Sequence, residues 1–189
     1  TAKQVKQMEQ AEKKSGHKMA PTELQLRYLY LLTLVNEKAD HNVDFILQRM
    51  ALCRRELTMY GKALSAICLD YFKQKAESEL TLQSLMEYTV ASPEKGRWFN
   101  TPRAEWSWNA YRIPTQCAAI EALTHFDREA DAHALRLWLL QAKRTQMWET
   151  SRATADAVYA LLMSANAAGS PVQTQKNVPV GFALKKGRK

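Results

Sequence analysis

Apolar residues along most of the chain recur at the three- and four-residue spacing that places them on one face of an α-helix. The clearest stretch follows Pro21 and Thr22, where a threonine at the N-cap position precedes apolar side chains as far as Val35. The same periodicity predicts further helices over 42–55, 58–71, 77–90, 115–123, 128–142 and 151–165. The pattern therefore predicts an all-α protein.

The two ends of the chain lack this regular apolar face. Residues 1–14 predict a polar, frayed helix that ends at Ser15, Gly16 and His17. After Ala165 the periodicity is lost, and glycine and proline punctuate the sequence up to Gly181. We therefore expect a polar N-terminal segment over 1–20, a helical domain over 21–165 and an extended basic tail over 166–189.

The helical period is interrupted over 91–114, which holds three of the six prolines and three of the five tryptophans. The alternation of polar and aromatic residues over 105–108 predicts a short extended piece or a small β-hairpin. Five aromatic residues of this insertion form a candidate partner surface: Trp98, Phe99, Trp106, Trp108 and Tyr111. The alternative is that these rings pack over the helix ends, because aromatic side chains bury a large area per residue.

A short motif of alanine, apolar, any residue, alanine, apolar occurs three times in the predicted helices. The copies are Ala63–Ile67, Ala119–Leu123 and Ala157–Leu161, at offsets of 56 and 38 residues. The insertion accounts for the longer offset. A small-residue helix that alternates with a larger-residue helix indicates stacked αα-hairpins. We expect the small-residue helices inside, where space is tight, and the leucine- and tryptophan-rich helices outside.

Composition supports a helical, globular chain. Only six glycines and six prolines occur in 189 residues, and the mean hydropathy is −0.42. No apolar run approaches the roughly 18 residues of a membrane span, so we expect no direct membrane insertion by this chain. The stretch from Thr1 to Lys18 is polar and shows no signal peptide, so the sequence by itself indicates no compartment.

The formal net charge is +8, and the excess of lysine and arginine gathers at the two ends. Basic proteins often bind nucleic acid, but no RNA-binding or zinc-finger motif accompanies these charges. Solvated chain ends explain them more simply. We therefore expect no nucleic-acid partner.

Cysteines and histidines give no sign of catalysis or metal binding. Cys53, Cys68 and Cys117 are odd in number and irregularly spaced, which does not indicate a disulfide framework. Cys68 and Cys117 lie on apolar helix faces, where they are expected to be small buried hydrophobes. The histidines have no zinc-site spacing, and no glycine-rich phosphate loop occurs. We therefore expect no enzyme activity, catalytic residue, metal or cofactor.

Three segments together resemble a known family. They are Leu57–Ala63, Trp106–Ala122 and Trp138–Trp148, the last followed by Thr154–Leu162. These segments are similar to the helical thioester-type domain of bacterial alpha-2-macroglobulin-like proteins. The resemblance covers roughly Pro21 to Met163. It is most specific in the third segment, where a helix ends near two tryptophans and a Thr-Ala-x-Ala-x-Tyr-Ala-Leu-Leu helix follows.

The resemblance implies a fold and a role. The family's domain is an (α/α) toroid with more helices than this chain supplies, so the chain would be mostly the second half of that ring. The family's large multidomain members trap or inhibit proteases in the cell envelope, periplasmic or lipid-anchored. The implied partners are other domains of the same parent protein and, through that parent, proteases.

The chain departs from the family at the reactive motif. Many members form a thioester between a cysteine and a glutamine three residues later, and no Cys-x-x-Gln occurs here. At that spacing Cys117 is followed by Ile120, Cys68 by Tyr71 and Cys53 by Glu56. Either the motif lies upstream of this chain or this member has none. The expected role is that of a non-catalytic domain fragment.

The sequence also allows a second function. Helical toroids also host carbohydrate-active proteins, and glycosidases use paired carboxylates. Glu105 lies beside Trp106 and Trp108 in the insertion. The alternative is therefore an α/α-toroid carbohydrate-binding or glycosidase-like module that uses the aromatic insertion.

Overall fold

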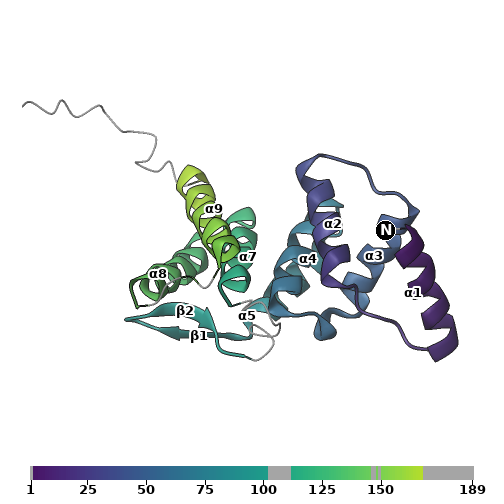
Figure 1. Ribbon diagram of the computed structural model, residues 1–189, viewed down its shortest axis with the longest axis horizontal. Helices are drawn as coiled ribbons and strands as arrows, with labels where there is room; N and C mark the ends of the chain where they lie inside the picture. The colour runs from purple at the N-terminus through teal and green to yellow at the C-terminus, as the bar shows by residue number, and fades with distance from the viewer. Residues whose placement is uncertain (1, 102–111, 146–147, 149, 168–189) are drawn as a thin grey trace, which may run out of the picture.

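A computed structural model describes residues 2–101, 112–145, 148 and 150–167 of the chain. Within these ranges the chain forms eight α-helices, one short 3-10 helix and one two-stranded antiparallel sheet (Figure 1). The predicted all-α class is therefore confirmed. The hairpin repeat and the toroid stay predictions.

The first elements of the chain include one helix, α2 (Glu23–Leu34), that begins directly after its predicted capping residue, Thr22. These elements are α1 (Ala2–Ser15), α2, α3 (His41–Leu52) and the 3-10 helix η1 (Arg54–Glu56). Thr22 caps α2 through a reciprocal pair, since its hydroxyl accepts from the Gln25 N–H and the Gln25 side chain accepts from the Thr22 N–H. Asp40 caps α3 by accepting from the Val43 N–H at 2.8 Å.

The expectation of a frayed N-terminal helix is wrong. In α1 the side chains of Val5, Met8 and Glu12 are buried, and the helix packs against α3. Val5 and Met8 are spaced by three residues and so share one face of the helix. Glu12 extends that face with an ion pair to Arg49 of α3, which a reading of the apolar pattern alone does not include.

The second half of the described chain contains α4 (Met59–Tyr71), α5 (Lys75–Met86), β1 (Thr89–Ser92), β2 (Gly96–Phe99), α7 (Arg112–His125), α8 (Glu129–Thr145) and α9 (Ser151–Ala167). Thr58 caps α4 by accepting from the Gly61 N–H at 3.0 Å, as predicted. Helix α7 begins at Arg112, before the expected Thr115. It can include Pro114 because the first turn of a helix does not use its backbone N–H groups.

A β-hairpin occupies the first part of the predicted insertion over 91–114 and begins two residues before it, at Thr89. The helix predicted over 77–90 ends at Met86, and Thr89 and Val90 instead pair with Phe99 and Trp98 of β2. Threonine and valine favour strands, and the cross-strand aromatic partners stabilise that state. The predicted extended piece over 105–108 lies outside the described residues.

Most helices belong to one of two packing groups, which we call the inner group (α2, α4, α7 and α9) and the outer group (α5, α8 and the hairpin). In the inner group α2 packs on α4, α4 on α7, and α7 on α9. In the outer group α5 packs on α4, α8 packs on α7, and the hairpin packs on α8 (Figure 1). The alanines of all three motif copies are buried, and α4 and α9 each pack against α7. Among the described residues, no helix combines the length and apolarity needed to cross a membrane.

Candidate functional site

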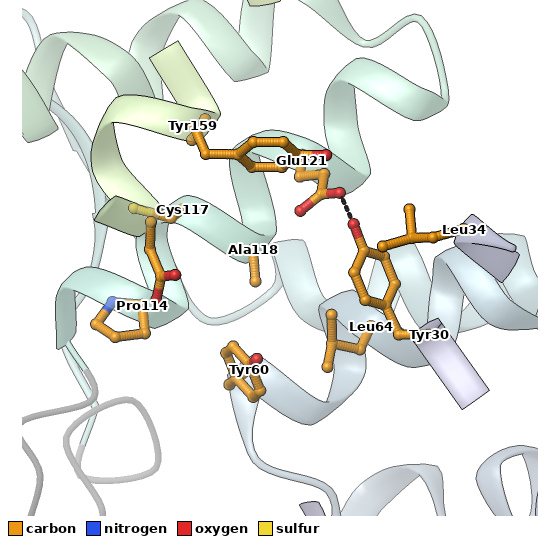
Figure 2. A pocket seen from close by; sticks show the side chains of 11 residues that line it. Tyr30, Leu34, Tyr60, Leu64, Pro114, Cys117, Ala118, Glu121 and Tyr159 are labelled. Atoms are coloured by element: carbon orange, nitrogen blue, oxygen red, sulfur yellow. Dashed lines mark hydrogen bonds between the residues drawn. The ribbon is translucent and has the colours of Figure 1, made fainter. Parts of the chain in front are cut away.

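A cleft lies among the four inner helices. Two adjoining cavities of about 270 and 570 Å³ occupy it, and both are lined by Tyr30, Leu34, Glu121 and Tyr159. The smaller cavity also contacts Tyr60, Leu64, Pro114, Cys117, Ala118, Asp156 and Ala160 (Figure 2). The larger one continues past Thr33, Ile67, Tyr71, Thr124, His125 and Met163.

Helical periodicity places these side chains on one side of each helix. On α9 the lining residues Asp156, Tyr159, Ala160 and Met163 follow the i, i+3, i+4, i+7 rule. The lining residues of α7 recur at the same spacing from Pro114 to His125. The cleft is thus built from whole helix faces, and small residues such as Ala118 and Ala160 leave the space that the cavities occupy.

Tyr30 and Glu121 join the two sides of the cleft. The Tyr30 hydroxyl on α2 donates a hydrogen bond to Glu121 Oε1 on α7 (Figure 2). Burial raises the pKa of the Glu121 carboxyl, although the Tyr30 hydrogen bond lowers it in part. Burial and the Glu121 charge both raise the pKa of Tyr30, so the phenol keeps its proton and acts as the donor.

A second carboxylate, Asp156, lines the smaller cavity. Burial raises its pKa, while the positive charges of Arg152 and Arg27 lower it in part. Arg152 Nε lies 3.8 Å from Asp156 Oδ2, one turn earlier on α9. A third carboxylate, Asp70, lies 2.9 Å from His125 Nε2, a ring that lines the larger cavity. The cleft therefore combines tyrosine rings with incompletely neutralised carboxylates.

The three thiols are protected rather than activated. Cys53, Cys68 and Cys117 are all buried, which confirms the expectation for Cys68 and Cys117. Burial raises the pKa of each thiol, and the negative charge of Glu56 adds to the effect at Cys53. Since the thiolate is the nucleophilic form, even Cys117 at the wall of the cleft is poorly suited to covalent chemistry.

The predicted aromatic partner surface is described only in part. Phe99 is 3% exposed and belongs to the hydrophobic core, and the half-buried Trp98 packs against that core. Trp106, Trp108 and Tyr111 lie outside the described residues, as does Glu105. These two rings therefore pack against the protein's own core, and the partner surface as a whole stays a prediction. Across the described ranges, no three His, Cys, Asp or Glu side chains are grouped to hold a metal ion.

Sequence reasoning missed the residues of the cleft, yet a signal for two of them was present. Glu121 and Tyr159 occupy the variable third position of the second and third motif copies. This glutamate and this tyrosine directly precede the buried Ala122 and Ala160, which makes them candidates for a polar contact beside the packed helix face. Tyr30 had no such signal, because its partner Glu121 lies 91 residues away.

No protein-family model, curated protein sequence or solved structure matches this chain.

Proposed function

We propose that this chain is a non-catalytic helical domain of an alpha-2-macroglobulin-like, protease-trapping protein of the cell envelope. The observation that carries this proposal is the order of the inner helices. Helices α4, α7 and α9, which bear the three motif copies, pack in sequence, while α5 and α8 flank them. Such alternation is what an (α/α) toroid requires, in agreement with the resemblance to that family of Leu57–Ala63, Trp106–Ala122, and Trp138–Trp148 followed by Thr154–Leu162.

Both ends of the inner row carry exposed apolar side chains. On α2 these include Leu24 and Leu31, and on α9 they include Val158 and Leu162. Contiguous apolar surface on a soluble protein marks an interaction site. In the proposed parent, neighbouring helices of the same ring or neighbouring domains would cover these two faces. The partners proposed for this chain are therefore the other parts of its parent protein.

The protected thiols fit a conformational role. The chain lacks a Cys-x-x-Gln motif, and its three cysteines are buried. In the parent protein, this domain would then contribute to trapping through its conformation and would form no covalent bond with the protease. Covalent capture, where the parent has it, would use a motif outside this chain.

A trapping assay on the product of the complete reading frame tests the proposal. A trapped protease is shielded from protein substrates but still cleaves a small peptide reporter that can diffuse to it. We expect the product to suppress casein cleavage by a panel of endopeptidases and to leave cleavage of a dipeptide reporter intact. Equal casein cleavage with and without the product, across the whole panel, would show the proposal to be wrong.

A matched pair of variants links the assay to this domain. Leu162→Glu places a charge on the exposed apolar face of α9, and Leu80→Glu makes the same change on the exposed face of the outer helix α5. We expect Leu162→Glu to weaken shielding and Leu80→Glu to preserve it. Identical shielding by both variants would argue that the α9 face has no partner in the parent.

The carbohydrate-binding alternative gains no observation from the described residues. Its tryptophan and glutamate candidates at 105–108 lie outside them, and the described ring of Phe99 is buried. It therefore stays a prediction from the sequence.

A further inference from the structure

We propose that the cleft between α2, α4, α7 and α9 binds an organic ammonium ion, with the cationic nitrogen between Glu121 and Asp156 and the alkyl part along the tyrosine rings. The ligand class is a primary alkylamine, either free or as the lysine side chain of a partner. This inference does not depend on the proposed function.

Glu121 lines both cavities of the cleft, so its carboxylate can contact a ligand in either one. Its carboxylate accepts from Tyr30, but within the described part of the chain no lysine or arginine forms an ion pair with it. Burial of this carboxylate raises its pKa, which means that its negative charge is poorly compensated in the protein as it stands. A bound cation would supply that compensation.

The cations nearest the cleft are already engaged with other groups. His125 Nε2 lies 2.9 Å from Asp70, and Arg152 pairs with Asp156 along α9. Arg27 pairs with Glu23 at 3.7 Å and lies over the Tyr60 ring, 5.2 Å from its centroid. A cationic ligand at Glu121 would therefore not have to displace an existing salt bridge of that carboxylate.

The aromatic lining selects an organic cation over a metal ion. Tyr30, Tyr60 and Tyr159 line the smaller cavity, and the face of an aromatic ring attracts an ammonium group within about 6 Å. Hard metal ions such as Ca²⁺ instead require about six to eight oxygen ligands. Two carboxylates among tyrosines and aliphatic side chains do not provide that number.

The space is suited to a small amine. Pockets for small molecules span roughly 300–1,000 Å³, and the cavities here measure about 270 and 570 Å³. Beyond the Tyr30–Glu121 pair, Leu34, Ile67 and Met163 give the larger cavity an apolar wall. An amine held at Glu121 could place a chain of a few methylene groups against that wall.

Isothermal titration calorimetry on the full chain tests the proposal with 1-aminopentane and with 1-pentanol, its neutral counterpart of nearly equal size. We expect saturable binding of the amine and at least tenfold weaker binding of the alcohol. N-acetyl-lysine amide, titrated in parallel, separates the two sources. Binding as tight as that of the free amine indicates a lysine side chain, and much weaker binding indicates a free alkylamine.

Two variants and one control assign the binding to this cleft. Glu121→Gln removes the charge and keeps an oxygen that accepts from Tyr30, so we expect about tenfold weaker amine binding. Tyr159→Leu removes a ring at the rim, on a residue 43% exposed, and we expect several-fold weaker binding from a chain that still folds. Glu87→Gln removes an equal charge from an exposed position away from the cleft and should bind as the unaltered chain does.

Three results would overturn the proposal. The first is no saturable amine binding by the unaltered, folded chain. The second is equal affinity for the amine and the alcohol. The third is equal amine affinity in Glu87→Gln and in whichever of the two cleft variants keeps its helical circular dichroism.

Discussion

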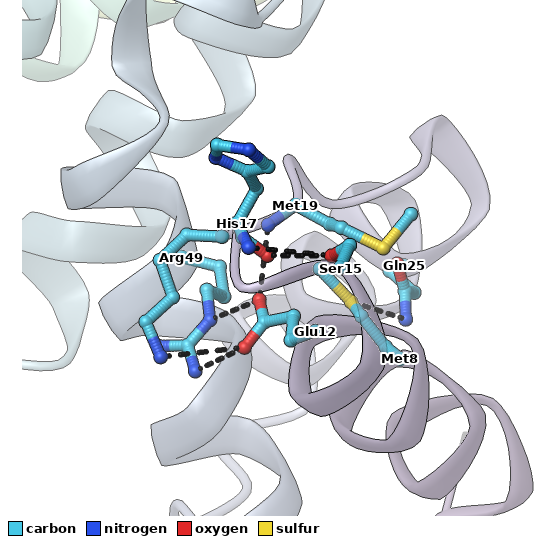
Figure 3. A network of polar contacts seen from close by, with 8 residues as sticks. Met8, Glu12, Ser15, His17, Met19, Gln25 and Arg49 are labelled. Carbon is cyan, nitrogen blue, oxygen red and sulfur yellow. Dashed lines mark hydrogen bonds and ion pairs between the residues drawn. The ribbon is translucent and has the colours of Figure 1, made fainter.

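Glu12 of α1 and Arg49 of α3 form a buried, two-pronged ion pair that docks the N-terminal helix. Arg49 Nε lies 2.6 Å from Glu12 Oε1, and Arg49 Nη2 lies 2.7 Å from Glu12 Oε2 (Figure 3). Glu12 also accepts from the Met19 N–H at 3.0 Å, so one carboxylate holds both α3 and the turn after α1. The guanidinium group of Arg49 lies over the Phe45 ring, 4.2 Å from the ring centroid, and the Arg49 side chain is buried.

Because Glu12 is an ionisable member of this pair, we expect the free energy of unfolding to depend on pH. The hydrogen bonds from Arg49 lower the pKa of Glu12 from 4.5 to about 2, although burial opposes the shift. A lowered carboxyl pKa stabilises the fold above pH 4.5, and the contribution is lost as the pH falls from 4.5 towards 2. The shift corresponds to about 3 kcal/mol at neutral pH. Urea unfolding at pH 7, 4.5 and 3 measures it.

The control for this prediction is a change of equal charge at an exposed site. Glu12→Gln should lower the free energy of unfolding at pH 7 and flatten its fall between pH 4.5 and 3. Glu37→Gln, on an exposed residue, should leave both unchanged. The same pH slope in Glu12→Gln and in the unaltered chain would contradict the assignment.

Local signals made most helices predictable, and long-range contacts explain the errors. Thr22 and Thr58 mark helix starts because an N-cap acts on the two or three residues that follow it. The docking of α1 was missed because Glu12 and Arg49 are 37 residues apart. The cleft was missed for the same reason, since it forms only when α2 and α9 come to lie on either side of α4 and α7.

The start of the hairpin at Thr89 was missed because it depends on the surface of α8, against which the hairpin packs. Gly96 has a positive φ of +77°, and a β-carbon there would lie 2.3 Å from the Ala134 carbonyl oxygen. The turn therefore sits directly against α8. Nothing in the sequence around Gly96 reveals that approach, which is made by a helix some 40 residues later.

Gly96→Ala should destabilise the protein more than Gly16→Ala. Both glycines have a positive φ, +77° and +72°, so both substitutions carry the strain of that backbone region, about 1–2 kcal/mol. A β-carbon at Gly16 has no neighbour within 4 Å, whereas one at Gly96 clashes with the backbone of α8. The difference between the two free energies of unfolding in urea measures the clash. Equal losses would show that the hairpin does not pack this closely.

Gln116 is the polar link between α7, the hairpin and α8. Its buried Nε2 donates to the Arg97 carbonyl at 2.8 Å and to the Leu135 carbonyl at 3.0 Å. Gln116→Leu removes both hydrogen bonds, and each contributes about 0.5–1.5 kcal/mol net. We expect a loss of about 2 kcal/mol, together with faster amide hydrogen exchange in β1 and β2. Gln83→Leu, on an exposed residue of α5, is the control and should have little effect.

The thiols should be unreactive in the folded chain. Cys53, Cys68 and Cys117 are buried, and burial raises the pKa of each. We expect a colorimetric disulfide reagent to label all three quickly in urea and none at a comparable rate in buffer. Leu52→Cys adds a thiol at a position 66% exposed, beside Cys53, and should react at an ordinary rate without urea. Rapid labelling of an unaltered, folded chain would contradict the burial of these thiols.

Glu121→Gln should raise the stability of the chain at neutral pH and weaken the binding of an amine in the cleft. Burial raises the pKa of Glu121, so its ionised form is less favourable in the folded chain than in the unfolded one. For a carboxyl with a raised folded pKa, stability falls as the pH rises from the unfolded pKa of 4.5 through the folded value. Glutamine removes that loss, and each kcal/mol gained raises the Tm by about 2–4 °C.

The pH dependence separates this explanation from a general effect of packing. The Tm advantage of Glu121→Gln over the unaltered chain should be clear at pH 7 and should vanish near pH 4, where the carboxyl is protonated. Asp156→Asn should follow the same trend more weakly, because Arg152 and Arg27 already offset part of its burial. Calorimetric melting curves across this range test both variants. A lower Tm for Glu121→Gln at pH 7 would contradict this explanation. It would mean that the ionised Glu121 carboxylate stabilises the folded chain through its hydrogen bond with Tyr30.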